Sequence, residues 1–163
     1  MYTKSFPPII GINPKVLILG TLPSKKSLEL KQYYGHPRNV FWKILFSLFS
    51  REFLSNYDNK KSLAIDNKVA IWDVCYTAVR KGSLDSAIKE ENPNKIDELI
   101  AIESSITTIA FNGQKAAKLY DKYFPKFDNI NYITLLSTSP ANAKYSFKEK
   151  LTDWSQIKIV DNN

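Results

Sequence analysis

Apolar residues along this chain follow two patterns. Four short runs are almost continuously hydrophobic, which is typical of central strands covered on both faces: 16–20, 69–74, 107–112 and 132–136. Between and after the runs, apolar residues recur at helical spacing over 39–49, 95–104, 114–124 and 147–157. Strands that alternate with helices predict an α/β fold with a mostly parallel sheet, in one domain spanning 1–163. The polar stretch 51–68 is expected to form a surface loop.

Each predicted strand ends in polar, turn-forming residues. In sheets of this kind, ligands bind beyond the carboxyl ends of the strands, so the four ends are expected to share one rim. The ends are Gly20-Thr21-Leu22-Pro23-Ser24, Asp73, Asn112-Gly113 and Ser137-Thr138-Ser139-Pro140-Ala141-Asn142. The sequence therefore predicts a binding site at this rim.

Charge and cysteine content narrow the classes of function. The chain has 23 Lys and Arg against 16 Asp and Glu, a net charge of +7 that favours a polyanionic partner such as nucleic acid. Its one cysteine, Cys75, excludes a disulfide framework, a four-cysteine zinc site and a cysteine-held iron–sulfur cluster within one chain. We expect Cys75 to be a core residue. With neither a membrane span nor a signal peptide evident, we expect a cytoplasmic protein, nucleoid-associated if bacterial.

The segment between the first predicted strand and the first predicted helix is the richest in useful side chains. Hydroxyls, backbone amides and lysines there suit phosphate binding, and two adjacent tyrosines suit stacking on a nucleobase. Structural roles are the alternatives: the tyrosines would belong to the edge of the core, and Asn39 would cap the next helix. The candidates are Thr21, Ser24, Ser27, Tyr33, Tyr34, His36, Arg38 and Asn39.

Three motifs together resemble the uracil-DNA glycosylase superfamily, and most closely its branch of DNA-deoxyinosine (hypoxanthine-DNA) glycosylases. They are Gly20-Thr21-Leu22-Pro23-Ser24, Tyr33-Tyr34-Gly35-His36-Pro37-Arg38-Asn39-Val40-Phe41-Trp42 and Ser137-Thr138-Ser139-Pro140-Ala141-Asn142-Ala143. Trp72-Asp73-Val74-Cys75, Gly82-Ser83-Leu84-Asp85 and Phe111-Asn112-Gly113 are similar to that branch too. The resemblance implies a three-layer α/β/α fold around a four-stranded, mainly parallel sheet. It also implies a DNA repair enzyme, monomeric and without metal or cofactor, that hydrolyses the N-glycosidic bond of a flipped, deaminated base.

The resemblance also assigns roles within the site. Asn39 matches the asparagine that carries catalysis in the hypoxanthine branch, and its amide can accept a hydrogen bond from water or donate one to a reacting atom. Asp73 and Asn112 are candidates for binding the N1–H and O6 edge of hypoxanthine, with Tyr33 or Tyr34 stacking on the base. The structural alternatives are a turn or cap at Asp73 and a left-handed turn at Asn112.

Contacts with the DNA backbone are expected at the polar side chains of the rim loops. Relatives place the residue that penetrates DNA just beyond the last motif, which makes Lys144 and Tyr145 the wedge candidates. The alternatives are a structural hydrogen bond for His36, a surface ion pair for Arg38 and a solvated helix start after 144. The phosphate candidates are Thr21, Ser24, Ser27, His36, Arg38, Ser137, Ser139 and Asn142.

Two departures from the uracil-specialised relatives bear on the substrate. Those relatives often carry Asp or Asn where Thr21 or Leu22 stands and His where Ser137 stands. Because this chain lacks both the Asp or Asn and the His, hypoxanthine is favoured over uracil as the substrate. Because no lysine is placed for Schiff-base chemistry, a monofunctional glycosylase is expected. The alternatives are a mismatch-specific uracil or thymine glycosylase and a lesion-DNA-binding protein of the same fold that is catalytically weak.

Overall fold

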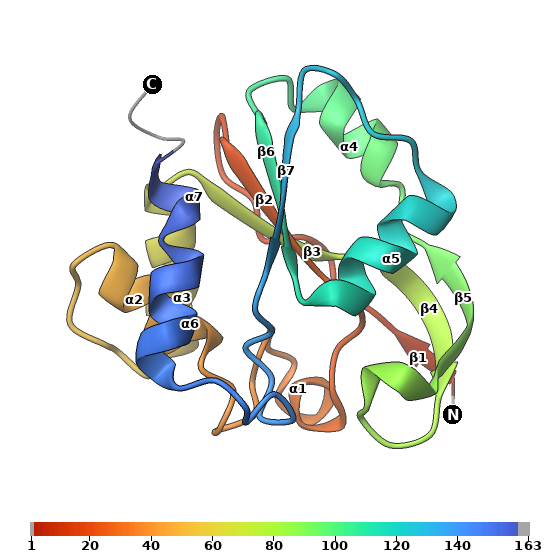
Figure 1. Cartoon of the computed structure of the whole chain (residues 1–163), viewed down its shortest axis with the longest axis horizontal. Helices are drawn as coiled ribbons and strands as arrows, with labels where there is room; N and C mark the ends of the chain where they lie inside the picture. The colour runs from red at the N-terminus through yellow and green to blue at the C-terminus, as the bar shows by residue number, and fades with distance from the viewer. Residues whose placement is uncertain (1, 160–163) are drawn as a thin grey trace.

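A computed structural model describes residues 2–159, and its centre is a parallel sheet of four strands (Figure 1). The strands are β2 (Val16–Gly20), β3 (Val69–Asp73), β6 (Thr108–Asn112) and β7 (Asn131–Leu135), in the order β3-β2-β6-β7. Every neighbouring pair is parallel, and Ile18 of β2 lies between Ile71 of β3 and Ala110 of β6. The predicted α/β fold with a four-stranded parallel sheet is confirmed.

Helices cover both faces of this sheet, which makes three layers (Figure 1). One face carries α2 (Phe41–Leu48), α3 (Tyr57–Asp66), α6 (Phe147–Trp154) and α7 (Gln156–Ile159), and the other α4 (Ile96–Ile102) and α5 (Gln114–Tyr123). Successive strand residues point to opposite faces, so Val16 and Ile18 enter one core cluster and Leu17 and Leu19 the other. Burial on both faces explains why the strands are almost continuously apolar.

A second sheet, which the sequence pattern does not reveal, has three antiparallel strands. It consists of β1 (Tyr2–Lys4), β4 (Cys75–Arg80) and β5 (Ile88–Pro93) in the order β1-β4-β5, with the 3-10 turn η1 (Asp85–Ala87) before β5. Only Val74 separates β3 from β4. The buried Asn94 amide donates to the carbonyl oxygens of Asp73 at 2.8 Å and Cys75 at 3.0 Å, which fixes this passage between the sheets.

Two expectations need correction. The stretch 51–68 is not all loop, because α3 occupies Tyr57–Asp66 and the Asn56 side chain caps it by accepting hydrogen bonds from the Asp58 and Asn59 amides. The helix expected over 147–157 is divided into α6 and α7 at Ser155.

Cys75 is 1% exposed, as expected of a core residue, and burial raises the pKa of its thiol to about 12. None of the helices in the described part of the chain is long and apolar enough to cross a bilayer.

Candidate active site

The carboxyl ends of the four parallel strands surround one cavity. Its walls come from the loop after β2, the segment before α2, the ends of β3 and β6, and the loop after β7. A further wall comes from the loop that links β4 to η1. The polar residues that line it are Thr21, Ser24, Ser27, Tyr33, Tyr34, Asn39, Asp73, Arg80, Ser83, Asp85, Asn112, Ser137, Thr138 and Ser139.

Among the residues that line this cavity, three buried polar atoms have no hydrogen-bond partner within the described part of the chain. They are Oδ2 of Asp73, which is 3% exposed, the hydroxyl of Tyr34 and Nε of Arg80. The Asp73 and Tyr34 side chains converge on Gly20, where an added Cβ would lie 2.7 Å from Asp73 Oδ1 and 2.7 Å from the Tyr34 hydroxyl. Buried polar groups are normally paired, so these atoms are suited to the polar groups of a ligand.

Burial and a neighbouring charge make Asp73 easy to protonate. Desolvation, reinforced by the negative charge of Asp85, raises its pKa to about 7, and the Arg80 guanidinium opposes the shift. Near neutral pH the carboxyl is therefore present in both forms. The neutral form offers one hydrogen-bond donor and one acceptor, whereas the carboxylate only accepts.

Replacing Gly20 by alanine is expected to slow the reaction of this site by about 10²-fold, because the added methyl displaces Asp73 and Tyr34 together. Single-turnover kinetics on the best substrate would measure this. Gly11→Ala is the matched control, because its methyl meets the side chain of Ile65 away from the cavity. The Gly11→Ala variant should have a lower melting temperature but an unchanged reaction rate. An equal loss of rate in both variants would contradict the role of Gly20 in leaving room for Asp73 and Tyr34.

The two tyrosines proposed to stack on the base occupy different places. The Tyr33 hydroxyl donates to the backbone carbonyls of Phe6 and Pro7, which lie 3.1 and 2.9 Å away, and Tyr33 is 3% exposed. Tyr34 has a left-handed backbone (φ 53°), and its ring stacks on Phe41 with centroids 3.9 Å apart. Tyr33 therefore supports the wall, while Tyr34 directs its hydroxyl to the centre of the site.

Asn112 connects two rim loops. Its Nδ2 donates to the Thr138 hydroxyl at 2.9 Å, and its Oδ1 accepts from the Thr138 amide at 3.0 Å. Asn112 is the last residue of β6, and the left-handed conformation falls on Gly113 (φ 96°) instead. The Thr138 carbonyl in turn accepts from the Val40 amide at 3.2 Å. The Asn112 side chain also lies near the Tyr34 hydroxyl, and one of its N–H groups is not used in the bonds to Thr138.

Asn39 stands at the start of α2 and lines the cavity. Its Oδ1 accepts from the Phe41 amide at 3.0 Å, but the N-cap of α2 is Val40, so Asn39 stands one residue before the expected cap position. Within residues 2–159 no hydrogen bond uses its Nδ2. The bond to Phe41 and a catalytic role for the amide N–H are therefore compatible in this residue, since they use different atoms.

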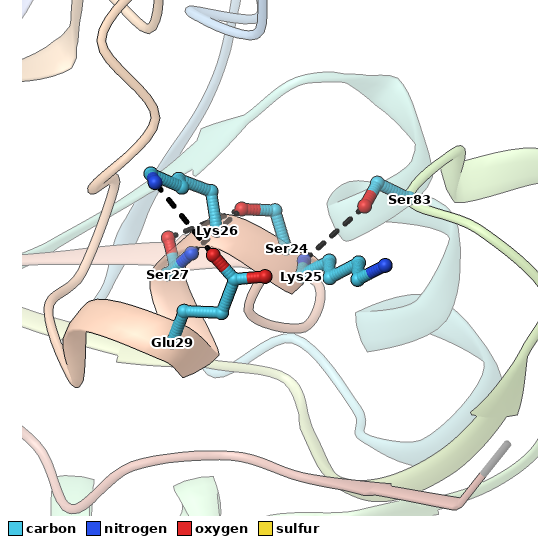
Figure 2. Close-up of polar contacts among 6 residues, drawn as sticks. All are labelled: Ser24, Lys25, Lys26, Ser27, Glu29 and Ser83. Carbon is cyan, nitrogen blue, oxygen red and sulfur yellow. Dashed lines mark hydrogen bonds and ion pairs between the residues drawn. The ribbon is translucent and has the colours of Figure 1, made fainter.

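The hydroxyls of the first rim loop are mostly used inside the fold. Ser24 caps α1 (Lys25–Leu30), accepting from the Ser27 amide at 3.2 Å (Figure 2). Ser27 is 2% exposed and accepts from the Gly35 amide, and Thr21 is 6% exposed and donates to Asp85 at 2.8 Å. Thr21 and Ser27 therefore have partners inside the fold, and phosphate contacts from these two residues and Ser24 stay predictions.

The other phosphate candidates lie closer to the surface. Arg38 is exposed, and its amide donates to Nδ1 of the half-buried His36 at 3.1 Å. In the loop after β7, the hydroxyls of Ser137 and Ser139 each accept from the backbone amide two residues later. The side-chain amide of Asn142 donates to the Ser137 carbonyl and so stabilises the same loop. Lys144 is exposed, and its ammonium lies 5.5 Å from the ring centroid of the half-buried Tyr145.

The structure also places residues that sequence reasoning did not assign. Arg80, which charge alone would place in solvent, is 4% exposed and donates to the Pro23 carbonyl beneath the first rim loop. Leu136 is held by α6, because Asp153 accepts from its amide at 2.7 Å and the Trp154 indole donates to its carbonyl at 2.8 Å. These contacts join segments distant in sequence, so no local pattern signals them. Among residues 2–159, no group of three or more acidic, His or Cys side chains is arranged to hold a metal ion.

Comparison with known proteins agrees with this architecture. The family model of the uracil DNA glycosylase superfamily matches residues 7–159. A hypoxanthine DNA glycosylase of Methanosarcina barkeri is 36% identical over 159 residues, covering 96% of this chain and 98% of the relative. One of Methanosarcina acetivorans is 33% identical over 160 residues, with the same coverage. A solution NMR structure of a candidate uracil DNA glycosylase from M. acetivorans superposes with a TM-score of 0.83 at 30% identity, over 99% of both chains. With its strand ends gathered around one polar cavity, this chain belongs to the uracil DNA glycosylase superfamily.

Proposed function

We propose that this enzyme excises hypoxanthine from deoxyinosine in DNA and leaves an abasic site. The observation that carries the proposal is the pair of unpartnered polar groups, the Asp73 carboxyl and the Tyr34 hydroxyl, beside Gly20 in the cavity. The names of the Methanosarcina relatives support the same substrate. The surplus of positive charge, +7, suits a DNA partner, and we propose that the enzyme acts as a monomer.

The edge of hypoxanthine fits the groups at the floor of the cavity. Hypoxanthine presents an N1–H donor next to an O6 acceptor. The neutral Asp73 carboxyl can accept from N1–H through one oxygen and donate to O6 through the other. The Tyr34 hydroxyl and the remaining N–H of Asn112 are further donors for a base oxygen. Such donors also stabilise the negative charge that develops on the departing base.

Hydrolysis of the N-glycosidic bond does not require a strong base. Cleavage of the N-glycosidic bond develops oxocarbenium character in the sugar, which a positioned water then captures. The Nδ2 of Asn39 can hydrogen-bond to a reacting atom while its Oδ1 keeps the bond from the Phe41 amide. The deoxynucleotide must leave the stack for its sugar to reach this amide, at a cost of a few kcal/mol that is smaller for a mispaired base.

Alkali cleavage of two otherwise identical duplexes, one with a single deoxyinosine and one with a single deoxyuridine, tests the proposal. We expect cleavage at deoxyinosine well above that at deoxyuridine, because Ser137 stands where uracil-specialised relatives often carry a histidine. Cleavage confined to deoxyuridine in a G·U pair would identify a mismatch-specific uracil glycosylase instead. Tight binding of both duplexes without cleavage would identify a lesion-binding protein.

A further inference from the structure

Two charged side chains of opposite sign reach the cavity from the second sheet and the loop that follows β4. Arg80 is the last residue of β4 and is buried, and the half-buried Asp85 is the first residue of η1. Both line the cavity that Asp73 also lines. The antiparallel part of the fold therefore supplies charge to a site that is otherwise built around the parallel sheet.

The guanidinium of Arg80 is buried without a direct ion pair. It donates to the Pro23 carbonyl, whereas its Nε has no partner, and no carboxylate among residues 2–159 forms an ion pair with it. A buried charge is costly unless opposite charges compensate it. The carboxyl groups of Asp85 and Asp73 interact electrostatically with this guanidinium, so the compensation comes from across the cavity.

The carboxylate of Asp85 is fixed in place. Its Oδ1 accepts from the Thr21 hydroxyl at 2.8 Å. Two residues earlier, the Ser83 hydroxyl accepts from the Lys25 amide at 3.2 Å, which attaches the same loop to the start of α1 (Figure 2). The negative charge therefore keeps a defined position relative to the cavity.

The other titratable groups close to Asp73 are neutral near pH 7. They are the hydroxyls of Tyr33 and Tyr34, from the segment before α2, and the thiol of Cys75, at the start of β4. Burial, reinforced by the negative charge of Asp73, raises the pKa of each of these groups well above its ordinary value. Among residues 2–159, the charges that act on Asp73 are therefore the guanidinium of β4 and the carboxylate of η1.

We propose that Arg80 and Asp85 are positioning residues that set the pH range in which Asp73 is neutral, and with it the pH range in which the site accepts hypoxanthine. This inference rests on the proposed function. The negative charge favours the neutral carboxyl and the positive charge favours the carboxylate, and both effects are strong where water is excluded. The neutral carboxyl can donate to O6 while it accepts from N1–H, whereas the carboxylate has no hydrogen to donate to O6.

The pH dependence of single-turnover excision from a deoxyinosine duplex tests this proposal. For wild type, the rate should fall around pH 7, where Asp73 loses its proton. Asp85→Asn keeps an oxygen for the Thr21 hydroxyl but removes the negative charge, so the midpoint of the fall should move down by about one pH unit. Arg80→Met removes the positive charge and should move the midpoint up by about one pH unit.

Opposite displacements distinguish control of charge from a structural role. A change that only disturbed the fold would lower the rate at every pH and leave the midpoint in place. Arg80→Lys, which keeps the charge, should keep the wild-type midpoint even if its rate is lower. Asp128→Asn also removes a negative charge, but from an exposed position, and should leave the midpoint unchanged. When Asp73→Asn is already present, neither Asp85→Asn nor Arg80→Met should alter the pH profile.

A second readout does not depend on excision. An NMR titration of the Asp73 carboxyl carbon in the DNA-free protein, assigned from the signal that Asp73→Asn removes, should show the same opposite displacements. Midpoints that stay in place, or that move in the same direction in both variants, would overturn the inference and leave the proposed function intact. If Arg80→Met does not fold, the displacement in Asp85→Asn alone decides. If wild type releases no hypoxanthine, the proposed function fails, and the titration still decides whether these two residues control the charge of Asp73.

Discussion

Asn39→Ala is expected to lower the single-turnover rate of hypoxanthine excision by about 10²–10³-fold, with little change in the affinity for deoxyinosine DNA. The Nδ2 amide is the group lost from the cavity wall that can hydrogen-bond to a reacting atom. The same change removes the acceptor of the Phe41 amide, 3.0 Å away, so stability should also fall by about 1 kcal/mol. Rates under enzyme excess and thermal melting measure the two effects separately.

Asn39→Asp separates the bond that Asn39 accepts from the Phe41 amide from a role in catalysis. Aspartate keeps an oxygen for the Phe41 amide but loses the amide donor, so we expect a wild-type melting temperature and a rate close to that of Asn39→Ala. An aspartate variant as fast as wild type would contradict a donor role. It would show that the reaction needs an oxygen that orients water.

Asp73→Asn is expected to stabilise the protein at pH 8 and not at pH 5. Since the pKa of Asp73 is raised from 3.8 to about 7, the folded state binds more protons than the unfolded chain between these values. The stability contributed by the neutral form is therefore full below about pH 4 and is lost as pH rises to about 7, by roughly 4 kcal/mol. The buried amide of the variant costs about 1–3 kcal/mol, which leaves a net gain of about 1–3 kcal/mol at pH 8.

Urea unfolding of wild type and Asp73→Asn at pH 5 and pH 8 measures this difference. Asp128→Asn is a suitable control, because Asp128 is exposed and lies away from the cavity. A stability difference that does not depend on pH would contradict an ionisation cost at Asp73. The asparagine also offers a donor and an acceptor at the floor of the cavity, so we expect the variant to retain excision and to lose little of it between pH 6 and pH 8.

The parallel sheet could be predicted because burial on both faces makes its strands apolar throughout. Val16–Gly20 coincides with the predicted first strand, and the ends of the other three agree within one residue. The second sheet lacks this signal, because β5 is mostly exposed and its sequence, IKEENP, is polar. Helix α3 buries only Leu63 and Ala64, so its pattern is too weak to distinguish it from a loop.

The site could be predicted as a set of residues but not as an arrangement. The sequence places Asp73 and Asn112 at strand ends, and parallel pairing brings these ends together. The contacts of Thr21 with Asp85 and of Lys25 with Ser83 cross about sixty positions, and no local pattern encodes them. The left-handed backbone of Tyr34, which sends its hydroxyl to Gly20, likewise depends on tertiary packing.

The way Thr138 is held has a consequence for how such sites evolve. Its amide and carbonyl bond to Asn112 and to the Val40 amide, so the frame that joins the loop after β7 to β6 and α2 is built partly from main-chain groups. The hydroxyls of Ser137 and Ser139, on either side, bond only to backbone amides of their own loop. Mutation at 137 and 139 therefore removes hydrogen bonds within that loop but leaves the frame at Thr138 in place. Substrate preference can diverge there among descendants while the fold and the position of Asn39 are inherited unchanged.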